Sequence, residues 1–116
     1  MVPEAFEILS GDDSLTLPFL SAGGVGVISV ASNLMPKDVS EFVRAWRDGR
    51  TQEAVDAHRR LYRLFKDLFI EPNPVPIKYA LSLKGAMSAE VRLPLCEMSV
   101  PNTEKLHATL SALKLL

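Results

Sequence analysis

The feature that most constrains this chain is a pair of short apolar runs separated by one short helical segment. Two runs have strand character, Ala5–Leu9 and Gly26–Val30. The second lacks the regular alternation of apolar and polar residues that is typical of a strand with one solvent-exposed face. Ser14–Ala22 between them predicts a short helix, weakened or kinked at Pro18. Strand, helix and strand in this order predict two parallel strands joined by a crossover, which is an α/β arrangement.

Two parallel strands that are apolar on both faces do not make a viable sheet by themselves. Such strands need neighbouring strands on each side and helices over both faces. The sequence therefore predicts that other chains supply the neighbours, or that the chain is part of a longer barrel or sheet. A chain of 116 residues has room for one small core only.

The second half of the chain is predicted to be helical. Thr51 is the expected N-cap of its longest helix. Glu71–Pro76 contains three prolines and is excluded as helix. Elsewhere apolar residues recur at helical spacing. The predicted helices run from Pro36 to Gly49, onward from Thr51, from about Ile77 to Lys84, and through Leu106, Leu110 and Leu113.

Charge and composition exclude several classes of function. The 13 basic and 14 acidic residues give no basic footprint, so nucleic-acid binding is not expected. Apolar runs are far shorter than the ~20 residues that a membrane span needs. Cys96 is the single cysteine, and Met1–Ala5 lacks the pattern of a signal peptide. The expected setting is reducing and cytoplasmic.

Two segments lie at the carboxyl ends of the predicted strands, Ser10–Asp13 and Ser29–Asn33. Parallel α/β folds bind ligands at that edge. Gly11 has no side chain, so a ligand can approach the backbone there. Asp12 is a candidate for orienting a substrate or holding a proton, with helix capping as the alternative. Asp13 is expected to cap the following helix, and no third acid or histidine is spaced to complete a metal site.

The other candidates have simpler structural explanations. Gly23–Gly26 ends a helix and leads into a strand, the reverse of a phosphate loop. His58 is expected to be solvated, and His107 to border a packed helix face. Cys96 is interpreted as a small buried hydrophobe. Asn73 lies between two prolines, so it either presents its amide with little freedom or forms a turn.

Three stretches occur in an order and at a spacing that resemble one enzyme family. They are ILSGDDSLTLPFLSAGGVGVISVASN (Ile8–Asn33), LFIEPNPVPIKYAL (Leu68–Leu81) and VRLPL (Val91–Leu95). Together they resemble the C-terminal part of the dihydrodipicolinate synthase family, within the pyruvate-dependent aldolase and N-acetylneuraminate lyase superfamily. The resemblance implies the last two βα units of a (β/α)8 TIM barrel in residues 1–50, followed by a C-terminal helical domain in residues 51–116.

The resemblance also implies a chemistry. In that family a lysine on an earlier strand forms a Schiff base with pyruvate, and the enamine adds to aspartate semialdehyde in lysine and diaminopimelate biosynthesis. The segments bearing that lysine and its proton-relaying tyrosine are expected to precede Met1, so no catalytic residue, cofactor or metal ligand is assigned. The substrate-binding positions that carry over are Gly11 and Ile28, Asp12 near the site mouth, and Asn73 close to it.

The sequence therefore supports two hypotheses of different classes. The first is the C-terminal portion of a dihydrodipicolinate synthase-type lyase, inactive alone and completed by the missing barrel half. The second is a truncated, non-catalytic paralogue that buries its strand edges in a homo-oligomer and acts as a binding or assembly module. The resemblance also implies that the short helix Ser14–Ala22 forms part of a subunit contact surface.

Overall fold

The computed structural model describes Pro3 and residues 5–116. Met1, Val2 and Glu4 lie outside the described residues, and so does most of the segment Met1–Ala5, for which no signal peptide was expected. The described chain is α/β and divides into two compact units, Met1–Arg60 and Leu61–Leu116. In chain order its elements are β1 (Leu9–Ser10), the 3-10 turn η1 (Asp13–Leu15), α1 (Thr16–Ser21), β2 (Gly26–Val27), the 3-10 turn η2 (Ala31–Asn33), α2 (Pro36–Arg47), α3 (Thr51–Asp67), α4 (Val75–Leu83) and α5 (Val100–Ala112).

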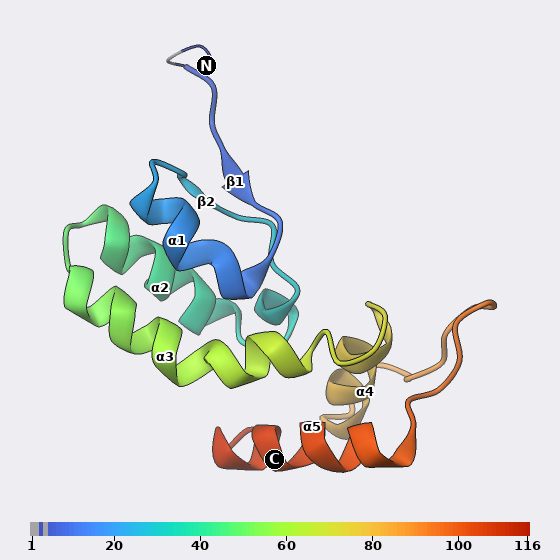
Figure 1. The fold of residues 1–116 in the computed structure, drawn as a ribbon. Coiled ribbons are helices and arrows are strands. Elements are labelled where there is room, and N and C mark those ends of the chain that lie inside the picture. The colour runs from blue at the N-terminus through green and yellow to red at the C-terminus, as the bar shows by residue number, and fades with distance from the viewer. Residues whose placement is uncertain (1–2, 4) are drawn as a thin grey trace. The chain divides into compact units, whose positions relative to one another are not determined.

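The first unit is built around the expected parallel strand pair (Figure 1). Leu9 lies opposite Gly26, and Ser10 lies opposite Val27. Beyond the pair, the Ile28 N–H donates to the Ser10 carbonyl at 2.9 Å. The helix α1 forms the crossover and packs against both strands. The prediction of a parallel pair with a helical crossover is confirmed.

Both strands are shorter than the sequence predicts. The expected strand Ala5–Leu9 begins only at Leu9, and the expected strand Gly26–Val30 ends at Val27. Within the described residues each strand has one neighbour, so the flanking apolar residues have no second strand to pair with. Ile28 is 69% exposed and Phe6 is 62% exposed. Burial on both faces is therefore not achieved by this chain alone.

The crossover helix is interrupted, but not at its proline. The predicted helix Ser14–Ala22 is divided into the 3-10 turn η1 and the helix α1. Pro18 lies in the first turn of α1, where its missing N–H leaves no helical hydrogen bond unmade.

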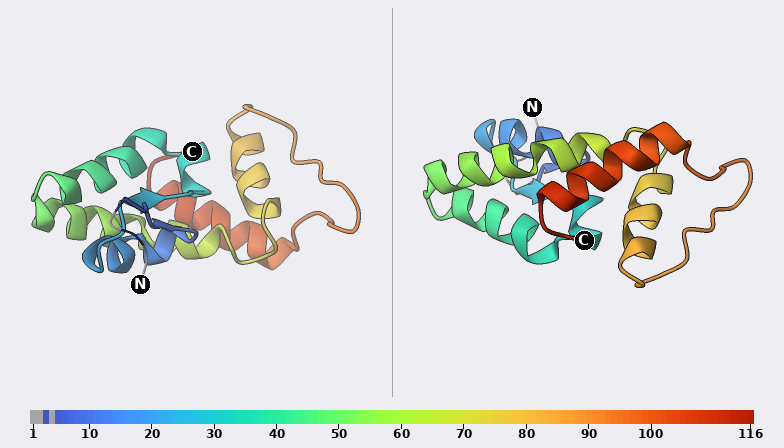
Figure 2. Two further views of the ribbon diagram at one scale, coloured as in Figure 1. Left: turned by 90° about the horizontal axis from the view of Figure 1, so that it is seen from above. Right: turned by 90° about the horizontal axis from the view of Figure 1, so that it is seen from below.

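The helix α2 lies beside the first half of α3 in the first unit (Figures 1 and 2). It begins at Pro36, as predicted, and buries Val39, Phe42 and Ala45. After α2, the guanidinium of Arg50 binds the carboxylates of three residues around the turn, Glu41 at 2.8 Å, Asp48 at 3.1 Å and Glu53 at 2.6 Å.

In the second unit α4 packs against α5, with a long connection between them (Figure 2). Leu106 and Leu110 of α5 are fully buried, as their helical spacing predicts. Asp67 at the end of α3 is 3% exposed and accepts a hydrogen bond from the Thr109 hydroxyl at 2.6 Å. The Lys105 ammonium lies 3.4 Å from the same carboxylate, so a buried acid joins α3 to α5.

Glu71 makes a second tie within this unit. Its Oε1 accepts hydrogen bonds from the Ser99 N–H at 3.0 Å, the Ser99 hydroxyl at 2.8 Å and the Asn102 amide at 2.7 Å. These donors, the Asn102 amide first, lower the pKa of the Glu71 carboxyl below its ordinary value. The side chain thereby fixes the start of α5 to the loop that follows α3.

Four helices end in the same hydrogen-bonded motif. In α2, the Gly49 N–H donates to the Trp46 carbonyl and the Arg50 N–H donates to the Ala45 carbonyl. This is the Schellman motif, with the residue after the cap in the left-handed region. The corresponding residues are Gly23 after α1, Gly49 after α2, Gly85 after α4 and Lys114 after α5.

Three local predictions are wrong. Thr51 is the first residue of α3, and the Arg50 carbonyl accepts the first helical bond, so Arg50 occupies the N-cap position. Cys96 is exposed, because it lies in the extended connection between α4 and α5. The proline-rich segment Glu71–Pro76 is helical in its last two residues, since Pro76 fits the first turn of α4.

Among the described residues, no helix combines the length and the apolar character needed to cross a membrane.

Candidate functional site

The turn after β1 is organised by Asp12. Its carboxylate accepts hydrogen bonds from the Ser14 N–H at 2.7 Å, the Ser14 hydroxyl at 2.6 Å and the Leu15 N–H at 3.2 Å. With φ −138° and ψ 126°, Asp12 has the extended backbone of an N-cap residue. It therefore caps the 3-10 turn η1.

Asp13 does not cap this helix, contrary to expectation, because the first helical turn begins at Asp13 itself. Its side chain is 1% exposed and reaches across to the turn after β2. The carboxylate accepts hydrogen bonds from the Ser29 hydroxyl, from the Val30 N–H at 2.9 Å and from the Ala31 N–H at 3.0 Å. Asp13 thus joins the two polar segments at the carboxyl ends of the strands.

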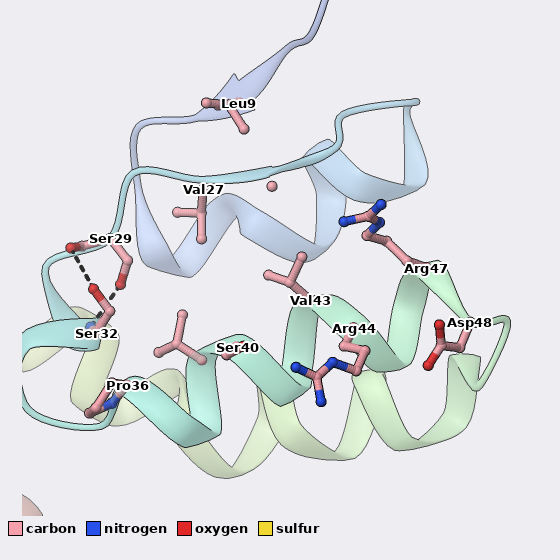
Figure 3. A pocket seen from close by; sticks show the side chains of 12 residues that line it. Leu9, Val27, Ser29, Ser32, Pro36, Ser40, Val43, Arg44, Arg47 and Asp48 are labelled. Atoms are coloured by element: carbon pink, nitrogen blue, oxygen red, sulfur yellow. Dashed lines mark hydrogen bonds between the residues drawn. The ribbon is translucent and has the colours of Figure 1, made fainter.

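Ser29 continues this network into the start of η2. Its Oγ accepts a hydrogen bond from the Ser32 N–H at 2.8 Å (Figure 3). The sequence singled out Ser29–Asn33 as a polar segment after a strand. It did not reveal that Asp13 would supply the acceptor for this segment, because the two lie 16 to 18 residues apart.

Three of the four expected substrate-binding residues lie at the ends of neighbouring strands. Gly11 and Asp12 follow β1 directly, and Ile28 follows β2. A Cβ atom added to Gly11 would meet no atom within 4 Å, so the space beside its backbone is open. Ile28 is 69% exposed. Asn73 belongs to the second unit, where it is exposed in the loop before α4, and its approach to the other three stays a prediction.

A separate cavity of about 560 Å³ lies between β2 and α2 (Figure 3). Val27 of β2 and Val43 of α2 point toward each other across it, and Arg44 and Arg47 lie along its wall. Gly11, Asp12 and Ile28 are not part of its lining among the described residues. The cavity runs along the strand pair and reaches Ser29 and Ser32, in the turn that follows β2.

Both histidines lie on helices rather than in the turns that follow the strands. His58 lies on α3 with its ring centroid 6.0 Å from that of Phe42, and partial burial lowers the pKa of its imidazole. It is therefore partly buried rather than solvated as expected. His107 is exposed on α5. Over the described residues, no three His, Cys, Asp or Glu side chains are grouped so as to hold a metal ion.

Two parallel strands with a helical crossover, and hydrogen-bonded polar turns at their carboxyl ends, are typical of parallel α/β proteins that bind ligands at this edge. A sequence profile of the Dihydrodipicolinate synthetase family matches residues 1–113. The chain belongs to this family, whose members are TIM barrels, and corresponds to a C-terminal portion of it.

Individual relatives agree with this assignment. The chain is 49% identical over 116 residues to the 4-hydroxy-tetrahydrodipicolinate synthase of Endomicrobium trichonymphae, covering 100% of this chain and 40% of that protein. It is 51% identical over 107 residues to the same enzyme of Aquifex aeolicus, covering 92% of this chain and 36% of that protein.

Solved structures give the same result. The 4-hydroxy-tetrahydrodipicolinate synthase of Methylacidiphilum fumariolicum SolV superposes with a TM-score of 0.96 at 56% identity, covering 97% of this chain and 38% of that one. Dihydrodipicolinate synthase of Aquifex aeolicus superposes with a TM-score of 0.95 at 49% identity, covering 98% of this chain and 39% of that one. The chain therefore spans about 40% of the length of the relatives it matches.

Proposed function

We propose that this chain is the C-terminal portion of a dihydrodipicolinate synthase-type lyase, which condenses pyruvate with aspartate semialdehyde in lysine and diaminopimelate biosynthesis. In this proposal residues 1–50 are the last two βα units of a (β/α)8 barrel, and residues 51–116 form the C-terminal helical domain. The observation that carries it is the pair of parallel strands with no further neighbours among the described residues, in a chain that matches about 40% of its relatives' length.

Within this proposal the chain contributes substrate contacts rather than the reacting amine. Gly11 and Ile28 border the bound substrates, Asp12 lies near the site mouth, and Asn73 is a fourth substrate-binding residue. Open space beside Gly11 and the exposure of Ile28 support the first two roles. Neither β1 nor β2 contains a lysine, and in this proposal the lysine of the Schiff base belongs to the N-terminal portion of the enzyme.

The capping bonds of Asp12 limit what its carboxylate does in the reaction. Because it accepts from the Ser14 and Leu15 N–H groups, it is fixed in direction at the start of η1. A carboxylate held in this way suits the orientation of a substrate better than the transfer of a proton. The loss of helix capping would accompany any change there.

Borohydride trapping tests the division of roles. Borohydride reduces a protonated imine to a stable secondary amine, so pyruvate becomes covalently attached to the lysine that binds it. The chain alone should give no adduct. When the chain is coexpressed with the N-terminal portion of the Aquifex aeolicus enzyme, the adduct should appear on that partner, together with condensing activity.

Two results would contradict the proposal. A specific adduct on one lysine of this chain would assign the amine to it. A stable complex of the two portions that neither forms an adduct nor condenses the substrates would show that the chain does not complete the enzyme.

A second function, a non-catalytic assembly module, is favoured by the exposed apolar residues beside the strands. Phe6, Ile8, Leu9 and Ile28 are all at least 41% exposed, and such edges pair readily with other strands. In that case the chain would form homo-oligomers that persist when the N-terminal portion is added. Sedimentation of the chain with and without that portion separates the two proposals.

A further inference from the structure

The buried carboxylate of Asp13 is used by neither of the roles proposed above. The Asp13 residue is 1% exposed, although it lies in the turn η1, which follows β1 at the carboxyl edge of the sheet. A buried carboxylate is costly unless its acceptor sites are satisfied. Here it accepts from the Ser29 hydroxyl and from the Val30 and Ala31 N–H groups, all of them in the segment that follows β2.

These bonds fix the backbone around Ile28 from one side. On the other side, the Ile28 N–H donates to the Ser10 carbonyl of β1 at 2.9 Å. The peptide group between Ile28 and Ser29 therefore lies between two anchors, the strand pair and the Asp13 carboxylate. Gly11 is two residues before Asp13, so the same side chain also fixes the distance between the Gly11 turn and the Ile28 turn.

We infer that Asp13 is a positioning residue for the substrate site: it holds the Gly11 and Ile28 backbones at a set separation without touching substrate. The inference rests on the proposed function, in which these two backbones border the bound substrates. Its physical basis is that reacting groups must be held closely, since a displacement of ~1 Å costs a rate factor on the order of 100.

The test uses the full 116-residue chain joined to the N-terminal portion of the Aquifex aeolicus enzyme. Asp13→Ala should lower kcat/KM roughly 10- to 100-fold, with a raised KM for pyruvate. Asp13→Asn should restore most of it, because an amide oxygen still accepts from the two N–H groups and its NH2 can donate to Ser29 Oγ.

Asp67→Ala is the matched control. Asp67 is also a buried carboxylate, at 3% exposed, and it accepts from Thr109 in the second unit. Its loss should lower the thermal midpoint as Asp13→Ala does and leave kcat/KM within about twofold, since it lies outside the strand turns.

Ser29→Ala is a milder variant that removes one donor to Asp13 and the acceptor for Ser32. It should lower kcat/KM by several-fold.

The outcomes separate the inference from the proposed function. If the unsubstituted fusion is inactive, the proposed function fails and the inference falls with it. If the fusion is active, and the Asp13 and Ser29 variants keep kcat/KM within about twofold as the Asp67 control does, the inference alone fails. Asp13 then contributes to stability only. A low kcat/KM at unchanged thermal midpoint in Ser29→Ala supports the inference even where Asp13→Ala does not fold.

Discussion

At the residue scale, Asp12 and Asp13 are the same amino acid one position apart, and the fold gives them unlike partners. Asp12 serves its own turn by capping η1. Asp13 serves another segment, through donors 16 to 18 residues away. The sequence could predict that an acid caps the helix, because capping is local. Which acid does so depends on where the first turn begins, and a one-residue difference reversed the assignment.

Gly11 permits a sharp test of its proposed role beside the substrates. Gly11→Ala should change the free energy of unfolding by less than about 0.5 kcal/mol, because a Cβ there meets no atom within 4 Å. In the completed enzyme the added methyl group should lower kcat/KM for pyruvate. Urea unfolding and steady-state kinetics on the same preparation check both statements.

The control for this substitution is Gly24→Ala. A Cβ at Gly24 would lie 2.8 Å from the Phe19 carbonyl oxygen, so α1 or the strand must shift. This variant should lose stability. An active Gly11→Ala enzyme with unchanged kinetics would remove Gly11 from the site.

Glu71 should make the second unit sensitive to acid. Its pKa is lowered by the Asn102 and Ser99 donors. Its contribution to stability is therefore complete above the ordinary glutamate pKa of about 4.3, and is lost as the pH falls through the lower folded-state value. Urea midpoints of the wild-type chain and Glu71→Gln, measured from pH 7 to pH 3, should differ at pH 7 and converge in acid.

Glu104→Gln on the exposed side of α5 is the control for this pH series, since no hydrogen bond from the described part of the chain joins it to Ser99 or Asn102. A difference in urea midpoint between wild type and Glu71→Gln that persists unchanged at pH 3 would show that ionisation of Glu71 does not contribute to stability.

At the scale of elements, the four Schellman endings differ in one residue. Lys114 adopts φ 57°, where α1, α2 and α4 have glycine. A side chain in the left-handed region costs about 1 kcal/mol relative to glycine. Lys114→Gly should therefore raise the free energy of unfolding by on the order of 0.5–1 kcal/mol, measured as a higher urea midpoint of the helical circular dichroism signal.

Gly49→Ala should lower the free energy of unfolding by an amount similar to the gain expected from Lys114→Gly. A Cβ at Gly49 meets no atom within 4 Å, so the change reports backbone conformation rather than crowding. Equal effects of the same sign in the two variants would show that the left-handed ending is not what determines their stability.

The helices were predicted more accurately than the strands, and for a physical reason. The residues Val39 and Phe42, or Leu106 and Leu110, lie on one helix face whose period can be read locally. Strand length depends on neighbours: the run Gly26–Val30 is strand only over Gly26–Val27, because pairing partners are limited to β1 within the described residues. At the candidate site, Gly11 was proposed from its place after a strand and from the family resemblance, and Ile28 from the resemblance alone; both assignments stay predictions. The link from Asp13 to Ser29 required the fold.

At the scale of the whole molecule, stability should depend on whether β1 and β2 gain further neighbours, since in the part of the chain that the structure describes each strand has only one. The thermal midpoint of the chain should rise when the N-terminal portion of a relative is added, because apolar residues such as Ile28 and Phe6 then leave water. Melting curves by circular dichroism, at several concentrations and with or without that portion, measure this. A midpoint that depends on the concentration of this chain alone, and not on the added portion, would favour the assembly module.

The open strand pair also bears on how the chain can be produced. Among the described residues each strand has one neighbour, and an apolar strand edge of this kind pairs readily with a strand of another unfolded chain. Synthesis of this chain without its completing portion should therefore yield precipitate and chaperone-bound material in proportion to expression level. Under the proposed function, the order in which this chain and the N-terminal portion are made would determine the yield.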